Sequence, residues 1–264
     1  MNKSISLIVA CVAPWLALNT RALDITPNFA DVPTGWVTDR YQPHSFSDVG
    51  TYQGRNNVLG IQITAAEGLT SRPTGDQFTF YNTQGMQHPL SGGAGSVISA
   101  DLYIPGSWSD PANGSVRTDM WGVMSDGSSV SDYPIIGFSN YGGAARYRIW
   151  DENLNGGSGG WVDLSTPVKY DAWTSFSLDF TGSSYIYSID GTPVFTDSEV
   201  NGTTGFQAII MQAYNFFGDT TLSGANPVAY TAYWSNSVPD VSGSLGLLGL
   251  GAGALVGLRR RLKV

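Results

Sequence analysis

Short runs of alternating apolar and polar residues, separated by turn-forming residues, restrict this chain to a β fold. Residues 98–104 alternate Ile, Ala, Leu and Ile with polar residues or tyrosine, and a second such run covers 175–180. A period of two is typical of a strand with one buried face. The apolar run 185–189 is followed by Asp190-Gly191 and an apolar return, which predicts a tight hairpin. Pro193 places the returning strand at an edge or a bulge.

The rest of the chain between its two ends follows the same pattern. Clusters of Gly, Asn, Asp, Ser or Pro separate the runs, and we find neither a repeat of fixed period nor a convincing amphipathic helix. The glycine-rich residues 153–160 predict a loop between two tryptophan-bearing strands. We therefore expect an all-β antiparallel sandwich of jelly-roll type. Further strands are expected at 58–64, 76–82, 120–124, 134–139, 145–150, 161–164, 206–214 and 228–235.

The last 27 residues predict a membrane segment. A short polar motif precedes an uncharged apolar run, residues 241–258, which would be ~27 Å long as a helix, near the minimum that spans a bilayer. The basic stop at 259–263 should stay on the cytoplasmic side. The motif residues are Val238, Pro239 and Asp240, and the arginines of the stop are Arg259, Arg260 and Arg261.

This tail resembles the PEP-CTERM class of bacterial sorting signals, in the variant that begins Val-Pro-Asp. The resemblance implies a partner, an exosortase-type membrane protease that cuts or transfers the protein at the motif.

The N-terminus predicts export. Lys3 supplies a positive start, residues 5–18 are apolar, and small residues at 20 and 22 favour cleavage after Ala22. The only cysteine, Cys11, lies inside this segment. The exported domain is therefore expected to fold without disulfides.

The region between the two ends is strongly acidic. Residues 23–237 contain seven basic and twenty acidic residues, a net charge of −13, and seventeen of the acids are aspartates. Such a domain repels nucleic acid, which excludes that class of partner. Aspartate and glycine favour turns, in agreement with many short strands.

Two neighbouring segments resemble the central hairpin of concanavalin A-like (laminin-G-like) jelly rolls. Residues 173–180 begin with Trp and alternate apolar residues, and residues 185–195 carry the Asp-Gly turn. The resemblance implies that superfold, with the strand at 228–234 returning beside the N-terminal strand. A fold does not fix a function.

Nothing in the sequence marks a glycosidase outright. The three glutamates, Glu67, Glu152 and Glu199, lack the Glu-x-Asp-x-x-Glu spacing common to retaining enzymes of this superfold. A pair of aspartates from different strands could still be assembled by the fold. His44 and His88 have no accompanying nucleophile elbow, which favours two surface-loop histidines.

A lyase remains an alternative, with His88 as base and Arg72 or Arg146 neutralising a uronate. The negative charge of the domain counts against a polyanionic substrate, unless the basic residues cluster on one face.

Calcium is the one cofactor that the sequence suggests. Asp151, Asn153 and Asn155, followed by Gly156, fit the first half of a calcium loop, in which oxygen ligands alternate. The twelfth position is Val162, where a bidentate glutamate belongs. A solvated hairpin tip is the alternative.

Seven tryptophans between residues 23 and 237 are candidates for stacking on sugar rings. Trp108 lies among polar loop residues and is expected to be exposed, while Trp150 and Trp161 flank the glycine-rich loop. Trp121 and Trp173 sit in alternating apolar runs and are expected in the core.

These observations combine into one expectation. The chain consists of a signal peptide (1–22), a β-sandwich domain (23–237) and a C-terminal sorting signal (238–264). It is exported through the inner membrane, anchored transiently by its C-terminal helix, and then reaches the cell surface or the extracellular matrix. The sandwich is expected to bind extracellular polysaccharide without catalysis. The alternatives are a polysaccharide-degrading hydrolase or lyase on the same fold, or a purely structural surface protein.

Overall fold

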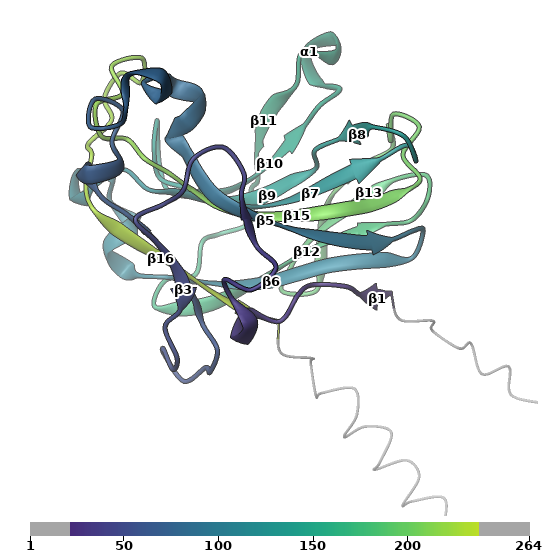
Figure 1. The fold of residues 1–264 in the computed structure, drawn as a ribbon. Coiled ribbons are helices and arrows are strands. Elements are labelled where there is room, and N and C mark those ends of the chain that lie inside the picture. The colour runs from purple at the N-terminus through teal and green to yellow at the C-terminus, as the bar shows by residue number, and fades with distance from the viewer. Residues whose placement is uncertain (1–21, 238–264) are drawn as a thin grey trace, which may run out of the picture.

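The alternating runs form two β-sheets that face each other (Figure 1). The structure is a computed structural model that describes residues 22–237. Sheet A contains, in spatial order, β14 (Thr192–Asp197), β13 (Tyr185–Ile189), β12 (Ala172–Phe180), β6 (Ser96–Ile104), β16 (Tyr230–Asn236), β4 (Leu59–Ile63) and β3 (Ser45–Asp48), with β1 (Leu23–Asp24) parallel to β6. Sheet B contains β11 (Gly160–Asp163), β10 (Arg146–Asp151), β9 (Ile135–Ser139), β7 (Arg117–Ser125), β15 (Gly205–Tyr214), β5 (Thr83–Gly92) and β2 (Val37–Thr38), with β8 (Val130–Asp132) beside β7.

The connections alternate between the sheets. The chain passes from β4 to β5, back to β6, on to β7, and later from β14 through β15 to β16. Neighbouring strands are antiparallel apart from the β1–β6 pair. The predicted antiparallel sandwich of jelly-roll type is therefore confirmed for the described residues.

Helices are short. One turn of helix, α1 (Leu154–Gly157), joins β10 to β11 within the predicted glycine-rich loop. The 3-10 helices in the described loops are Phe29–Asp31, Ala65–Glu67, Thr74–Asp76, Thr79–Asn82, Gly106–Ser109 and Pro111–Asn113.

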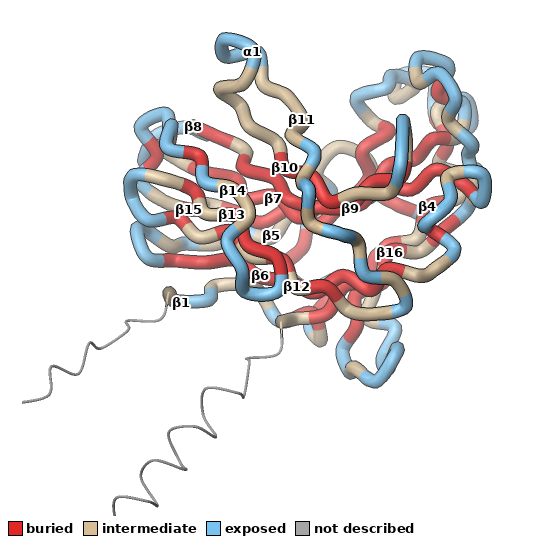
Figure 2. Tube along the Cα trace, turned by 180° about the vertical axis from the view of Figure 1, so that it is seen from behind, coloured by how far each residue is buried: buried red, intermediate tan, exposed pale blue. Residues whose placement is uncertain are grey.

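The core lies between the sheets and combines aromatic with aliphatic side chains. Figure 2 shows buried residues along the strands of both sheets and exposed ones in the loops and at α1. Trp234, on β16 of sheet A, is fully buried and donates from Nε1 to Thr118 Oγ1 on β7 of sheet B, at 3.0 Å. This bond satisfies the one polar group of a large apolar side chain.

The Asp-Gly hairpin forms as predicted. Asp190 and Gly191 have φ values of 49° and 73°, the two positive values of a type I′ turn. Pro193 lies on β14, at the edge of sheet A, and a register shift between β13 and β14 marks a bulge. Both parts of the prediction for Pro193 are confirmed.

The prediction of a strand at 76–82 is wrong. These residues form parts of two 3-10 helices, and the strand begins only at Thr83. The side chain of Asn82 is buried and donates to Asp219 Oδ2 at 2.7 Å, which ties this segment to a loop.

The two ends of the described chain meet at sheet A. β1 and β16 share one edge of β6, and Asn236 accepts from Phe29 N at 2.9 Å and donates to Pro27 O at 2.8 Å. The return of the last strand beside the N-terminal segment is thus observed.

No helix within residues 22–237 is long and apolar enough to cross a membrane. The predicted membrane helix at 241–258 lies outside the described residues.

Candidate functional site

An aromatic row crosses the outer face of sheet B, the face turned away from sheet A. Cross-strand pairing aligns Trp161 with Trp150, Trp150 with Ile135, Ile135 with Trp121 and Trp121 with Ile210. Directly paired residues point to the same side of a sheet. The intervening residues of β7 point inward and belong to the core. The row is therefore set by the register of five strands.

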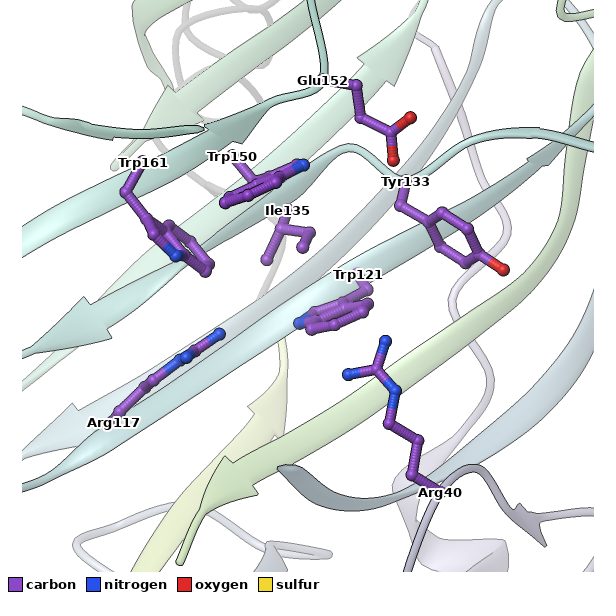
Figure 3. Close-up of a pocket in the computed structure, with 8 residues that line it drawn as sticks. All are labelled: Arg40, Arg117, Trp121, Tyr133, Ile135, Trp150, Glu152 and Trp161. Atoms are coloured by element: carbon purple, nitrogen blue, oxygen red, sulfur yellow. The ribbon is translucent and has the colours of Figure 1, made fainter. Parts of the chain in front are cut away.

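A pocket of about 290 Å³ opens over this row (Figure 3). The rings of Trp150 and Trp161 lie 5.3 Å apart at 68°. Trp121 is only 5% exposed, and its Nε1 has no hydrogen-bond partner among the described residues. The lining residues are Arg40, Arg117, Trp121, Tyr133, Ile135, Trp150, Glu152 and Trp161.

A charged row lies next to the aromatic one. Asp119 Oδ2 accepts from Arg117 Nε at 2.9 Å and from Gln212 Nε2 at 2.6 Å, and it lies 3.4 Å from Arg148 Nη2. Gly137, opposite Asp119 on β9, leaves the space that this carboxylate occupies, because a Cβ there would collide with Asp119 Oδ1 and with the Thr118 carbonyl. The row therefore depends on a glycine in the neighbouring strand.

Guanidinium groups cover the tryptophans. The guanidinium carbons of Arg117 and Arg148 lie 4.6 and 3.6 Å from the ring centroid of Trp161, within the range of cation–π attraction. Burial, followed by repulsion from Arg117, lowers the pKa of Arg148 to about 9. Several cations are thus held against an aromatic surface and away from bulk water.

Arg40 closes the opposite side of the pocket. It follows β2, and its guanidinium carbon lies 4.6 Å from the ring centroid of Trp121 and 4.8 Å from that of Phe80. Its Nε lies 3.7 Å from the Asp39 carboxylate. Burial lowers the pKa of Arg40, Asp39 raises it, and the charge of Arg117 lowers it further.

A carboxyl pair stands at the end of the pocket near Tyr133. Burial, together with the charge of Asp132, raises the pKa of Glu152 to about 7. Burial raises the pKa of Asp132 to about 6, and its carboxylate accepts from Tyr133 N at 2.9 Å and from Asn201 Nδ2 at 3.3 Å. A carboxylic acid that keeps its proton near neutral pH can act as a general acid.

Two of the three tryptophans expected to bind ligand lie in this pocket, and the third does not. Trp150 and Trp161 line it. Trp108 is 7% exposed and stacks on Phe138 within the core, at 5.6 Å between ring centroids. The expected exposure of Trp108 is wrong, because the 3-10 turn that carries it directs its ring under sheet B rather than into solvent.

Of the two tryptophans expected in the core, Trp121 is confirmed as a buried core residue, whereas the expectation for Trp173 is wrong. Trp121 is buried on the outer face of sheet B, in a cluster separate from the main core. Trp173 is half-buried on the outer face of sheet A, where its Nε1 donates to Gln53 O at 3.0 Å.

The predicted calcium loop forms a compact turn. Asp151 Oδ1 accepts from Asn153 N at 2.9 Å and from Leu154 N at 3.1 Å. Asn153 Nδ2 donates to Glu199 O, and Asn155 Nδ2 donates to Gly159 O, at 3.1 and 3.2 Å. Within residues 22–237 no group of three or more His, Cys, Asp or Glu side chains lies close enough to hold a metal. Calcium binding here stays a prediction.

The residues suggested for a lyase are not brought together. His88 is in β5 rather than a loop and pairs with the core residue Ile209, so it lies on the inner side of sheet B. Arg146 lies on the outer face and pairs with Asp163 at 2.7 Å. Arg72 is buried and donates to Asn82.

The sorting residues Val238, Pro239, Asp240, Arg259, Arg260 and Arg261 lie outside the described residues. Cleavage after Ala22 stays a prediction.

Sequence reasoning missed most of the pocket. Arg40, Arg117 and Tyr133 carry no local pattern that sets them apart. Glu152 was weighed only for its spacing to other glutamates. One signal was available, because Glu152 follows the predicted strand 145–150 by two residues, and an extended chain there would point it to the same side as Trp150.

No protein-family model and no curated protein sequence matches the chain. Among solved structures, it is similar to a glycosidic hydrolase (11% identity, TM-score 0.45, covering 82% of this chain and 99% of that one). It is also similar to a carbohydrate-binding module from Bacillus subtilis (12% identity, TM-score 0.39, covering 81% of this chain and 94% of that one). A third similar structure is a β-glucanase from Bacillus licheniformis (14% identity, TM-score 0.41, covering 78% of this chain and 91% of that one). Likeness at this level does not decide a function, which has to be inferred from the side chains of the pocket.

Proposed function

We propose that the outer face of sheet B binds a polysaccharide. The observation that carries this proposal is the pocket bordered by Trp121, Trp150 and Trp161. Indole faces pack against the apolar faces of sugar rings, while a few polar groups at the rim fix the orientation of a ligand. The guanidinium groups of Arg40 and Arg117 supply such polar groups.

Cleavage of the bound polysaccharide is the second candidate, and Glu152 favours it over purely non-catalytic binding. Its raised pKa leaves it partly protonated at neutral pH, as a general acid requires. Burial raises the pKa of Tyr133, and the charges of Asp39 and Glu152 raise it further, so both carboxyl groups act on the same hydroxyl. In this candidate Glu152 protonates the leaving oxygen while water attacks the anomeric carbon. Asp39, which lies beside Arg40 just outside the pocket lining, is the proposed base that takes the proton from this water.

A panel of polysaccharides tests binding and cleavage together. The purified full chain should bind at least one of them, and Trp121→Ala should weaken that binding about tenfold or more through the lost aromatic contact. Trp173→Ala, on the outer face of sheet A, is the matched control and should bind as the wild type does. If no polysaccharide binds, or if the control weakens binding as much as Trp121→Ala, the proposal is wrong and a purely structural role gains support.

Each bound polysaccharide is then incubated with the protein. New reducing ends or unsaturated products that disappear in Glu152→Gln would establish cleavage. Binding without any product would leave a binding protein.

We also propose that the chain is exported and sorted by an exosortase. The supporting observations are the signal-like N-terminus, the Val-Pro-Asp motif, the apolar run 241–258 and the arginines behind it. Replacing Pro239 and Asp240 by Ala should leave an unprocessed form in the membrane fraction. Normal processing of this double variant would contradict the proposal.

A further inference from the structure

The basic residues of this acidic domain gather on one face. Residues 23–237 contain only seven, and four of them lie on or over the outer face of sheet B. Arg117 and Arg148 are separated by a single strand, and Arg40 approaches the same pocket from the far side. The four are Arg40, Arg117, Arg146 and Arg148. Asp39, Asp119 and Asp163 lie beside these arginines, so the face is a mixture of charges rather than purely basic. It nevertheless holds most of the cations of a domain with a net charge of −13, which makes it the surface best suited to an anion.

Two of these arginines present unused donors to the pocket. In the described chain the Arg117 side chain forms one hydrogen bond, from Nε to Asp119, and the Arg40 side chain forms none, so their Nη groups remain available. Figure 3 shows the two guanidinium groups on different sides of the pocket, that of Arg40 beside Trp121 and that of Arg117 near Trp161. The buried Nε1 of Trp121, which also lacks a partner within residues 22–237, adds a further donor.

The pocket has few groups to balance these donors. Asp119 lies in the adjacent row and is shared among Arg117, Arg148 and Gln212. Among the described residues that line the pocket, Glu152 alone carries a carboxyl group, and the Asp39 carboxylate, outside the lining, lies 3.7 Å from Arg40 Nε. The charge of Arg117 acts unfavourably on Arg40, and an anion placed between the two would relieve that repulsion.

We propose that this pocket binds an acidic sugar unit, whose carboxylate or sulfate lies between the guanidinium groups of Arg40 and Arg117. The inference rests on the proposed polysaccharide binding and names the class of polysaccharide. Planar guanidinium groups recognise carboxylate and sulfate oxygens through paired N–H donors, and the neighbouring tryptophans pack against the sugar ring.

Pairs of polymers that share a backbone and differ only in charge test this inference. Polygalacturonate and its fully methyl-esterified form share one backbone, and so do a sulfated galactan and its desulfated form. Binding to the purified full chain is measured by calorimetry at low and high salt. We expect at least one acidic polymer to bind tenfold or more tightly than its neutral counterpart, and salt to weaken that binding. The polymer that binds identifies the anion as carboxylate or sulfate.

Variants localise the effect. Arg40→Gln and Arg117→Gln should each weaken binding of the acidic polymer roughly 10- to 100-fold, as expected when a charge-assisted hydrogen bond is lost. The matched control is Arg55→Gln, because Arg55 also lies over a tryptophan, 4.8 Å from the Trp173 ring centroid, but on sheet A. Thermal unfolding of each variant checks the fold. If Arg117→Gln unfolds, the binding measured for Arg40→Gln tests the inference alone. Arg40→Gln should stay folded, because the one ion pair of Arg40 in the described chain, to Asp39, is long at 3.7 Å.

Each outcome has a defined meaning. Equal binding of acidic and neutral polymers would overturn the inference and leave polysaccharide binding intact. Failure of all four polymers, together with the wider panel, would overturn both. Equal weakening in Arg40→Gln and Arg55→Gln would also overturn the inference, because net charge rather than the pocket would then govern binding.

Discussion

Replacing Glu152 by Gln should change the stability of the protein in a pH-dependent way. The pKa of Glu152 rises from its ordinary value of 4.5 to about 7 in the folded chain, chiefly through burial. The folded state therefore binds the proton more tightly than the unfolded state does. The stability that this provides is fully present below pH 4.5 and is lost as the pH rises through 7.

The size of the effect follows from the pKa difference. The change from 4.5 to about 7 corresponds to about 3 kcal/mol at most, and partial contact of the carboxylate with solvent reduces it. Glutamine resembles the protonated acid. Glu152→Gln should thus leave the free energy of unfolding within about 0.5 kcal/mol of wild type at pH 4, and raise it by one to about 3 kcal/mol at pH 8. Asp132, whose pKa is raised to about 6, keeps part of the pH dependence in both proteins.

Urea unfolding at pH 4, 6 and 8 measures this difference directly. Glu199→Gln is the control, because it removes one carboxylate from an exposed loop and matches the change in net charge. A stabilisation by Glu152→Gln that is equal at pH 4 and pH 8 would refute the burial argument. An equal pH-dependent gain in Glu199→Gln would attribute the effect to net charge instead.

Three further substitutions test the architecture of the site. Trp108→Ala should lower the free energy of unfolding by about 3–5 kcal/mol, as measured in urea, because its ring fills the core rather than a ligand site. Gly137→Ala should cost about 1–3 kcal/mol in the same assay, since its methyl group would meet the Asp119 carboxylate and a backbone carbonyl. Gly159→Ala, at a φ of +70° and with its Cβ against the Trp150 ring, should shift tryptophan fluorescence and weaken polysaccharide binding. Unchanged stability in the first two, or unchanged fluorescence and binding in the third, would contradict these assignments.

Much of the fold could be predicted because local patterns carry it. The strand at 98–104 has a period of two, and the hairpin around Asp190-Gly191 adds a turn that requires positive φ. β5 was missed because Thr83–Gly92 contains three glutamines or glycines in its first half and a proline later, which weakens any alternation. Its partner β15, which is strongly apolar, supplies the pairing that makes it a strand.

The site could not be predicted in the same way, because its residues meet only through pairing between distant strands. Alternation assigns residues to a face within one strand, yet it does not say which strands become neighbours. Arg40 and Trp161 reach one pocket from opposite edges of sheet B. The sequence therefore contains the pocket residues without any sign of their proximity.

β7 shows why the sequence could not separate Trp121 from the main core between the sheets. Residues 118–124 are all buried, and residues 120–124 are apolar on both sides of the strand, so alternation cannot tell which side meets sheet A. Met120 turns inward to the main core, whereas Trp121 and Val123 form a second apolar cluster on the outer face. That cluster is covered by individual side chains from other segments, Arg40 and Tyr133 among them, rather than by a second layer of strands. A sheet that keeps an apolar outer face at this position, bordered by arginines with free donors, has the features of a surface built to receive a ligand.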